Sequence, residues 1–120
     1  MRRLVVAPRA QRDIHIIIQQ SRDRHGSRAA DRYRRLIDLA LTQLCNDVVP
    51  LSSKPADIGN LRLYALRFAA RGLPLANTVR APVHVIAYQF DDRRVDIVRI
   101  LHEAMDLPRH LEGATPRNDE

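Results

Sequence analysis

The chain has 120 residues, 45% of them hydrophobic and 28% charged, which predicts one folded domain with a core and excludes disorder as a description of the whole. No apolar run approaches the roughly 18 residues that a membrane span needs, and the apolar stretch near the N-terminus is too short for a signal peptide. The single cysteine, Cys45, excludes an internal disulfide and a cysteine-based zinc site, and we expect it to be a core thiol. We therefore expect a cytoplasmic protein without a membrane partner.

The net charge of +6 is unevenly distributed along the chain. Residues 1–35 hold ten arginines and three aspartates, whereas the remaining residues hold ten basic and eleven acidic groups. Such an excess indicates an acidic partner or nucleic acid, and a solvated helix face is the alternative interpretation. Only five aromatic residues accompany the charge and no base-reading motif is present, so the sequence favours the docking of an acidic protein.

The first half of the chain predicts a strand followed by two helices. Residues 3–7 are β-branched in the middle and are followed by a proline, which predicts a strand. Apolar residues then recur at helical spacing until the block 22–26, which ends in a helix-terminating glycine. Ser27 is the expected N-cap of a second helix that reaches about Val48. Two helices with so short a connection predict an antiparallel hairpin.

The second half predicts a loop and three strands. Residues 46–59 are rich in proline, serine and glycine, which is typical of a loop. The expected strands cover three ranges: 61–68, 83–90 and 94–101. A long connection over 71–82 separates the first two of these strands, and a tight turn at Asp91 and Asp92 joins the last two. The last strand is apolar on both faces, which predicts a central strand covered on both sides.

The order β-α-α-β-β-β predicts an α+β domain of two layers. The apolar stripe of a helical hairpin needs a surface to cover, and a small, mainly antiparallel sheet supplies one. The first strand must join the same sheet, because a lone strand would leave its backbone groups unpaired. We expect this single domain to cover residues 1–111, with a disordered tail at 112–120.

Standard catalytic signatures are absent from the sequence, and none of the five histidines pairs with another at a metal-ligand spacing. We therefore predict no metal and no cofactor. The end of the last strand is more informative, because a buried strand there becomes polar at once. Strand alternation predicts that Arg99 and His102 face opposite sides of the sheet. A histidine suits acid–base chemistry near neutral pH, but closure of the strand by His102 and Glu103 is the favoured interpretation.

The segment Val95–Leu111, VDIVRILHEAMDLPRHL, resembles the C-terminal signature of the ParE branch of the RelE/ParE toxin superfamily: a hydrophobic strand, R-x-L-H-x-x-M-D and a short tail. The opening, with Ala10 before Asp13, and the run Gly59–Arg62 are similar to the start of that family and to its G-x-R entry into a strand. The resemblance runs from about residue 3 to residue 111. It implies the toxin of a type II toxin–antitoxin system, encoded beside an antitoxin that binds it in a hetero-oligomer and silences it.

The two branches of the superfamily imply different actions. ParE-type toxins are implied to poison DNA gyrase and so to block replication and growth, whereas RelE-type toxins are implied to cleave messenger RNA on the ribosome. The near absence of lysine favours the ParE branch, and so do the acids Glu103 and Asp106, because a ribonuclease would place positive charge there. A ribonuclease remains the alternative, as does an inactive member that only sequesters an antitoxin.

Three sets of candidate residues follow from the residues and the resemblance. A ribonuclease would use Arg62, Arg67, Arg99 and His102, whereas a gyrase inhibitor needs no catalytic residue. The candidates for binding the target are Arg99, His102, Glu103, Met105, Asp106 and Arg109. The candidates for binding the antitoxin are Arg9, Arg12, Arg28, Arg32 and Arg35.

Overall fold

The computed structural model describes residues 1–71, 73, 79, 81–105 and 107–111. Its elements, in chain order, are β1 (Arg3–Val6), α1 (Pro8–His25), α2 (Ser27–Asn46), β2 (Lys54–Pro55), β3 (Arg62–Ala65), α3 (Leu66–Ala70), β4 (His84–Phe90), β5 (Arg94–His102) and α4 (Leu107–Leu111). The expected tail 112–120, Asp106 and most of the expected connection 71–82 lie outside the described residues.

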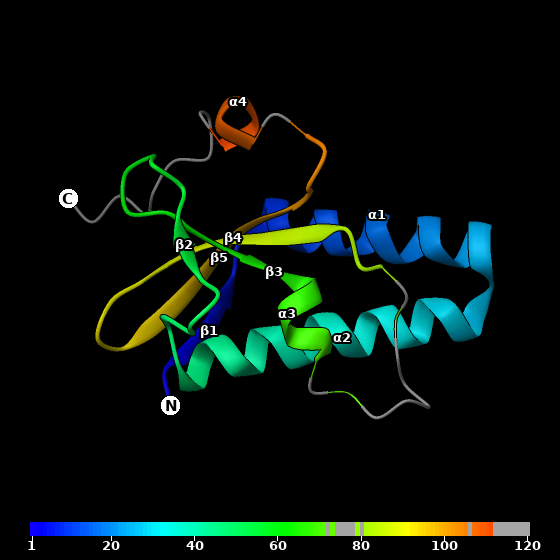
Figure 1. Cartoon of the computed structure of the whole chain (residues 1–120), viewed down its shortest axis with the longest axis horizontal. Coiled ribbons are helices and arrows are strands. Elements are labelled where there is room, and N and C mark those ends of the chain that lie inside the picture. The colour runs from blue at the N-terminus through cyan, green and yellow to red at the C-terminus, as the bar shows by residue number, and fades with distance from the viewer. Residues whose placement is uncertain (72, 74–78, 80, 106, 112–120) are drawn as a thin grey trace.

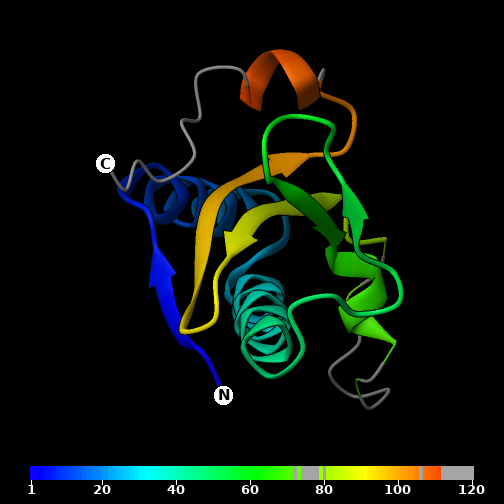
Figure 2. The same cartoon turned by 90° about the vertical axis from the view of Figure 1, so that its left-hand side faces the viewer.

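The strands form one sheet in the order β1-β5-β4-β3-β2. β1 runs parallel to β5, and the other neighbours are antiparallel. The helices α1 and α2 form the predicted hairpin, and α4 lies on the opposite side of the sheet from α2 (Figure 2). The α+β prediction, with a helical hairpin on a mainly antiparallel sheet, is therefore confirmed.

The sheet separates two hydrophobic clusters. The larger lies between the sheet and the hairpin and contains Leu36, Ile37 and Tyr88. The smaller lies on the other face and contains Val98 and, from α4, Leu111. β5 contributes to both clusters, as its apolar faces predict, because the hairpin covers one face of the sheet and α4 the other. Its neighbours in the sheet are β1 and β4. Residue 45, the cysteine, is buried, which confirms its prediction as a core thiol.

Several short elements differ from the sequence-based expectation. The strand expected over 61–68 ends at Ala65, because Leu66 and Ala69 are buried at helical spacing in α3. The expected loop 46–59 contains the two-residue strand β2, which pairs with β3. The helix α4 forms at the end of the expected domain, where no helix or strand was expected. These elements are too short to carry a clear periodicity, so tertiary contacts decide them.

The connection of the hairpin also differs in detail. α1 continues through Arg22 to His25 instead of ending at the polar block. Gly26, and not Ser27, precedes α2, and its φ of 89° lies in the region that favours glycine. Because Gly26 turns the chain by its own backbone, both helices can approach it without a side-chain cap. Among the described residues, no helix is long and apolar enough to cross a membrane.

Candidate functional site

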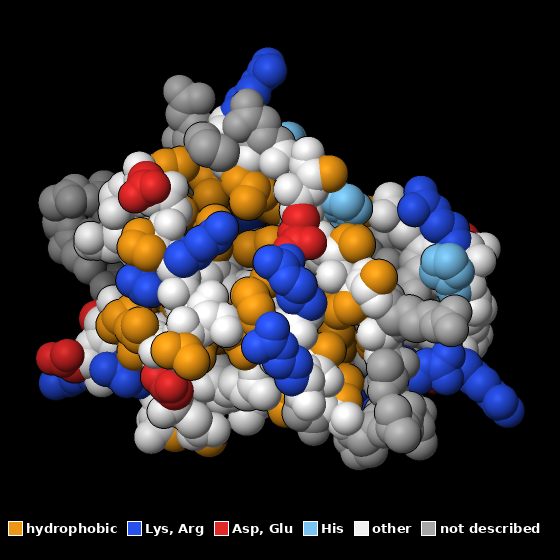
Figure 3. Space-filling model, viewed as in Figure 1, with side chains coloured by type: hydrophobic (Ala, Val, Ile, Leu, Met, Phe, Trp, Pro, Cys, Tyr) orange, Lys and Arg blue, Asp and Glu red, His pale blue; other side chains and the backbone are white. Residues whose placement is uncertain are grey.

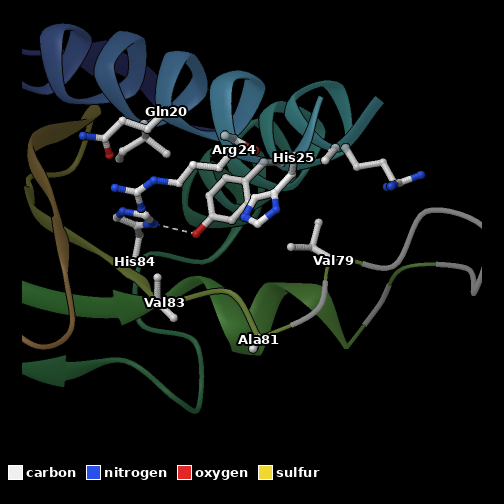
Figure 4. Close-up of a pocket in the computed structure, with 12 residues that line it drawn as sticks. Gln20, Arg24, His25, Val79, Ala81, Val83 and His84 are labelled. Atoms are coloured by element: carbon white, nitrogen blue, oxygen red, sulfur yellow. Dashed lines mark hydrogen bonds between the residues drawn. The ribbon is translucent and has the colours of Figure 1, made fainter. Parts of the chain in front are cut away.

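Two histidines and a tyrosine meet where β4 begins and β5 ends. His84 and His102 are direct partners in the β4–β5 register, and their ring centroids lie 5.5 Å apart. The hydroxyl of Tyr33, from α2, lies 2.5 Å from Nδ1 of His84 (Figure 4). Burial, and secondarily the neighbouring His102, lowers the pKa of His84 to about 4, while burial raises the pKa of Tyr33 to about 12. His84 is therefore uncharged at neutral pH and Tyr33 keeps its proton.

A partly buried ion pair fixes α1 against the same end of β5. Nε of Arg99 donates to Oδ2 of Asp13 over 2.8 Å, and Nη2 donates to Oδ1 over 3.1 Å. The backbone N–H of Ile100 donates to Oδ2 over 3.0 Å. Both charged side chains are only 13% exposed. β1 pairs with β5 only as far as Ile97. Beyond that residue, the Asp13 carboxylate accepts the hydrogen bond from the edge of β5 that β1 does not reach.

Arg67 and Glu103 form a second ion pair, between α3 and the residue after β5. The guanidinium of Arg67 also lies 4.8 Å from the ring centroid of Phe68, and that of Arg71 lies 4.9 Å from it. Figure 3 shows Lys and Arg side chains among hydrophobic ones over this part of the molecule. The Arg67 side chain is 51% exposed, so solvent weakens this pair far more than the pair of Arg99.

Arg62 belongs to a third network, on the face of the sheet that carries Tyr88. Its Nε donates to Oγ of Ser53 over 2.8 Å, and its Nη2 donates to the Ser53 carbonyl over 3.2 Å. The Tyr88 hydroxyl lies 2.6 Å from the same Oγ and donates to the Val48 carbonyl over 2.6 Å. Arg62 pairs with Tyr88 in the register, so four residues of β4, about 13 Å, separate it from His84.

The structure does not bring the four groups of the ribonuclease alternative together. Arg62 bonds to Ser53, and His102, whose ring lies against that of His84, accepts a 2.9 Å hydrogen bond from the Ala104 N–H. The other two groups, Arg67 and Arg99, form the ion pairs described above. Strand alternation predicts opposite sides for Arg99 and His102, but both line one groove beside α1. The ladder is regular from Arg99 to His102, so the alternation holds there, and the long Arg99 side chain reaches the groove through its ion pair with Asp13.

The candidates for target binding divide among several surfaces. His102, Met105 and Arg99 line the groove beside α1. Glu103 faces Arg67, and Arg109 is exposed on α4. His84 and Tyr33 are not among the residues predicted from the sequence, although both lie at the centre of this region. The alternating pattern of β4 places His84 on the same face as Tyr88. That pattern could have identified His84 as a candidate residue.

The five arginines proposed for the antitoxin do not form one patch. In an antiparallel hairpin joined at residue 26, Arg12 lies about 21 Å from the turn and Arg28 about 3 Å from it. Arg9 and Arg12 therefore occupy one end of the hairpin, and Arg28, Arg32 and Arg35 the other half. Of the five, Arg32 lines a cleft, while the other four are exposed on the helices.

Two adjoining clefts run along the open side of α1. One has a volume of about 540 Å³ and lies between α1 and the end of β5. The other, of about 880 Å³, lies between the tip of the hairpin and the start of β4 (Figure 4). Ile17, Gln20, Arg24 and His84 line both. Within the described residues, no group of three or more His, Cys, Asp or Glu side chains could hold a metal ion.

Comparison with known proteins gives one family and a set of similar folds. The family model described as "ParE toxin of type II toxin-antitoxin system, parDE" matches residues 4–107. No curated protein sequence matches the chain significantly. Among solved structures, the chromosomal ParDE toxin–antitoxin system of P. aeruginosa aligns with a TM-score of 0.65 and 15% identity, over 85% of this chain and 96% of that chain.

Two E. coli structures also share the fold. YafQ from strain BL21(DE3) aligns with a TM-score of 0.55 and 14% identity, over 87% of this chain and 96% of that one. The DinJ–YafQ toxin–antitoxin complex aligns with a TM-score of 0.54 and 15% identity, over 86% of this chain and 93% of that one. Identities this low establish a common fold and no more.

Proposed function

Because the chain belongs to the ParE toxin family of type II toxin–antitoxin systems, we propose that it inhibits DNA gyrase and thereby blocks replication and growth until an antitoxin neutralises it. This action would stabilise the plasmid or chromosome that encodes the pair, and it places the chain in the cytoplasm with gyrase. The protein would act by binding, without chemistry of its own.

The observation that carries this proposal is the commitment of the basic residues to internal contacts. A ribonuclease needs a base, an acid and phosphate-binding groups that converge on one scissile bond. Here Arg62 and His102 lie at different points of the sheet, and Arg67 and Arg99 are neutralised by carboxylates. This arrangement favours a protein that acts through a binding surface. It does not favour a protein with a catalytic centre.

The same proposal includes a hetero-oligomer with a cognate antitoxin. The ParDE system of P. aeruginosa and the E. coli DinJ–YafQ complex are toxin–antitoxin assemblies that share this fold. Antitoxin segments of this kind fold on binding and can cover a large part of the toxin surface. The excess of arginine in residues 1–35 supports an acidic segment as that partner.

A supercoiling assay with purified bacterial gyrase and relaxed plasmid tests the proposed target. We expect the chain to reduce supercoiling and to increase gyrase-linked cleaved DNA, and we expect added antitoxin to reverse both effects. Heat-denatured chain is the control. Full supercoiling at a tenfold molar excess of folded chain over gyrase would contradict the proposal. Cut messenger RNA in a translation reaction, lost in His102→Gln, would favour the ribonuclease instead.

A further inference from the structure

The excess positive charge of the chain gathers at residues 22–35, where α1 ends and α2 begins, and we call this segment the hairpin tip. It holds two aspartates and six arginines, so it supplies +4 of the net charge of +6. The arginines are Arg22, Arg24, Arg28, Arg32, Arg34 and Arg35. The turn between the helices lies at one end of the molecule, beyond the sheet (Figure 1), and Figure 3 shows Lys, Arg and His side chains at that end.

The charges of the hairpin tip are free. None of its six arginines forms an ion pair with another described residue, whereas Arg67, Arg94 and Arg99 each have a carboxylate partner. Five of the six are exposed, and Arg32 is half-buried in the wall of the larger cleft. Arg24 lines the same cleft, which has no carboxylate among its described lining residues (Figure 4). These arginines therefore remain available to an anion outside the chain.

Three of the arginines form a stripe along α2. Arg28, Arg32 and Arg35 follow one another at helical spacing, so they lie on one face of the helix. The stripe is about 10 Å long, which equals the rise of about three base pairs of duplex DNA. A guanidinium can donate two parallel hydrogen bonds to one phosphate. The stripe therefore matches successive phosphates of one nucleic-acid strand.

The composition of the hairpin tip distinguishes among anionic partners. An acidic protein would need apolar or aromatic anchors at the centre of its interface, but none of the large hydrophobic side chains exposed on the described chain lies in residues 22–35. A single-stranded nucleic acid would need exposed rings for stacking, but Tyr33, the aromatic residue of the tip, is half-buried with its hydroxyl against His84. A duplex can be bound through its phosphates by charge alone.

We propose that the hairpin tip binds the phosphate backbone of duplex DNA, with Arg28, Arg32 and Arg35 along one strand. The contact is independent of base sequence, because phosphate contacts carry no sequence information. This inference rests on the proposed function in one respect, which is that the duplex is the DNA that gyrase holds. The toxin is then bound both by the enzyme and by the enzyme's DNA.

The test measures the affinity of the full chain for a labelled duplex of about 20 base pairs, by fluorescence anisotropy at several salt concentrations. The double variant Arg28→Glu/Arg32→Glu should bind about tenfold or more weakly at 50 mM NaCl. It should also lower the slope of log K against log salt by about 2, since each phosphate contact contributes about 0.9.

The matched control makes the same change in net charge at the other end of the molecule (Figure 1). It is the double variant Arg3→Glu/Arg93→Glu, at two exposed arginines whose backbones are hydrogen-bonded to each other. Because salt screens exposed charges that lie more than a Debye length apart, this control should stay within twofold of wild type and keep its slope.

Equal weakening in the two double variants would overturn the inference, because net charge and not the hairpin tip would then determine binding. Polyglutamate is the second probe, at the same concentration of charge. If it bound as tightly as the duplex and lost affinity in Arg28→Glu/Arg32→Glu, the tip would be a surface for acidic protein and the inference would also fail. Circular dichroism checks folding, and Arg28→Gln/Arg35→Gln replaces the first variant if it does not fold.

The gyrase assay separates this inference from the proposed function. A wild-type chain that inhibits gyrase but has no affinity for the duplex at 50 mM NaCl would overturn the inference only. A wild-type chain that binds the duplex but leaves supercoiling unchanged would contradict the proposed target only. If both proposals hold, Arg28→Glu/Arg32→Glu should need a higher concentration than Arg3→Glu/Arg93→Glu to increase gyrase-linked cleaved DNA.

Discussion

Asp13 is the residue that joins the helical hairpin to the end of β5. One carboxylate accepts two hydrogen bonds from the guanidinium of Arg99 and one from the backbone of Ile100. Bonds of this kind are charge-assisted, and low exposure keeps water from screening them. The Asp13 side chain therefore accepts a hydrogen bond from the backbone at the edge of β5 and balances the charge of Arg99, which lies 86 residues away in the chain.

We expect Asp13→Ala to lower the free energy of unfolding by about 2–4 kcal/mol, because it leaves the Arg99 charge and the Ile100 N–H without their acceptor. Asp13→Asn should cost less, since its amide oxygen can still accept from one of them. Urea denaturation measures both. Asp38→Ala, which removes an exposed aspartate from α2, is the control and should stay near wild type. Equal stability of Asp13→Ala and Asp38→Ala would contradict this role.

The partly buried His84 predicts a loss of stability in weak acid. Its pKa is about 4 in the folded chain and near 6.5 when unfolded, so the unfolded state takes up a proton first as the pH falls. The contribution of His84 is complete above pH 6.5 and is lost as the pH falls toward 4. We expect a loss of roughly 1–2 kcal/mol, reduced by partial exposure of the ring.

Unfolding titrations between pH 4 and pH 7 test this expectation. His84→Asn, which keeps an acceptor for the Tyr33 hydroxyl, should flatten the pH dependence. His15→Gln, a change at an exposed histidine of α1, should leave it unchanged. A slope that is the same in wild type and in His84→Asn would assign the acid sensitivity to other groups.

At the scale of elements, the hairpin depends on one backbone conformation. Gly26 has a φ of 89°, its N–H bonds to the Arg22 carbonyl, and its own carbonyl accepts from the Ala30 N–H. It thus ends α1 and begins α2 at the same residue. A Cβ at this position would meet no atom within 4 Å, so the backbone conformation alone calls for glycine.

Gly26→Ala should therefore lower the free energy of unfolding by about 1–2 kcal/mol through backbone strain without a steric clash. Thermal unfolding measures the effect. Ser27→Ala is the matched control and should be nearly neutral, because Ser27 lies within α2 and no side-chain hydrogen bond caps this helix. A larger loss in Ser27→Ala than in Gly26→Ala would contradict the role of the glycine.

The helix α4 closes the smaller hydrophobic cluster with the buried Leu111 and the partly buried Leu107. Leu111 is 1% exposed and packs on the face of the sheet opposite the hairpin. We expect Leu111→Ala to cost about 2–4 kcal/mol, as for other buried leucines. Leu51→Ala removes the same atoms at a fully exposed position and should cost less than about 0.5 kcal/mol. Similar midpoints in urea for the two variants would show that α4 contributes little.

At the scale of the whole molecule, the net charge of +6 should govern association. The proposed partner is acidic, and exposed charges more than about 8 Å apart are screened at physiological salt. We expect the dissociation constant of the antitoxin complex to rise by about tenfold or more between 50 and 500 mM NaCl, mainly through slower association. Stopped-flow measurements at several salt concentrations test this. Affinity that is independent of salt would contradict an electrostatic contribution.

The hairpin and the main strands could be predicted because their apolar residues repeat at a helical or an alternating period. The histidine pair could not. Counting back from the tight turn, where Phe90 pairs with Val95, an unbroken ladder would place Leu101 opposite His84. The structure instead pairs Ala87 with Arg99 and Tyr88 with Ile97, which leaves Val98 as an extra residue and brings His102 to His84. One bulge therefore decides which side chains meet at the candidate site.

The sequence by itself determined the fold class, the hairpin, the central strand and the family signature, because these depend on the chemical type and spacing of nearby residues. Only the tertiary structure decided which charges remain available to a partner. Arg99 is neutralised by Asp13 and Arg67 by Glu103, while Arg24 remains in an open groove beside the exposed Ile16. Such pairings join residues far apart in the chain, and they depend on register and packing, which local periodicity does not specify.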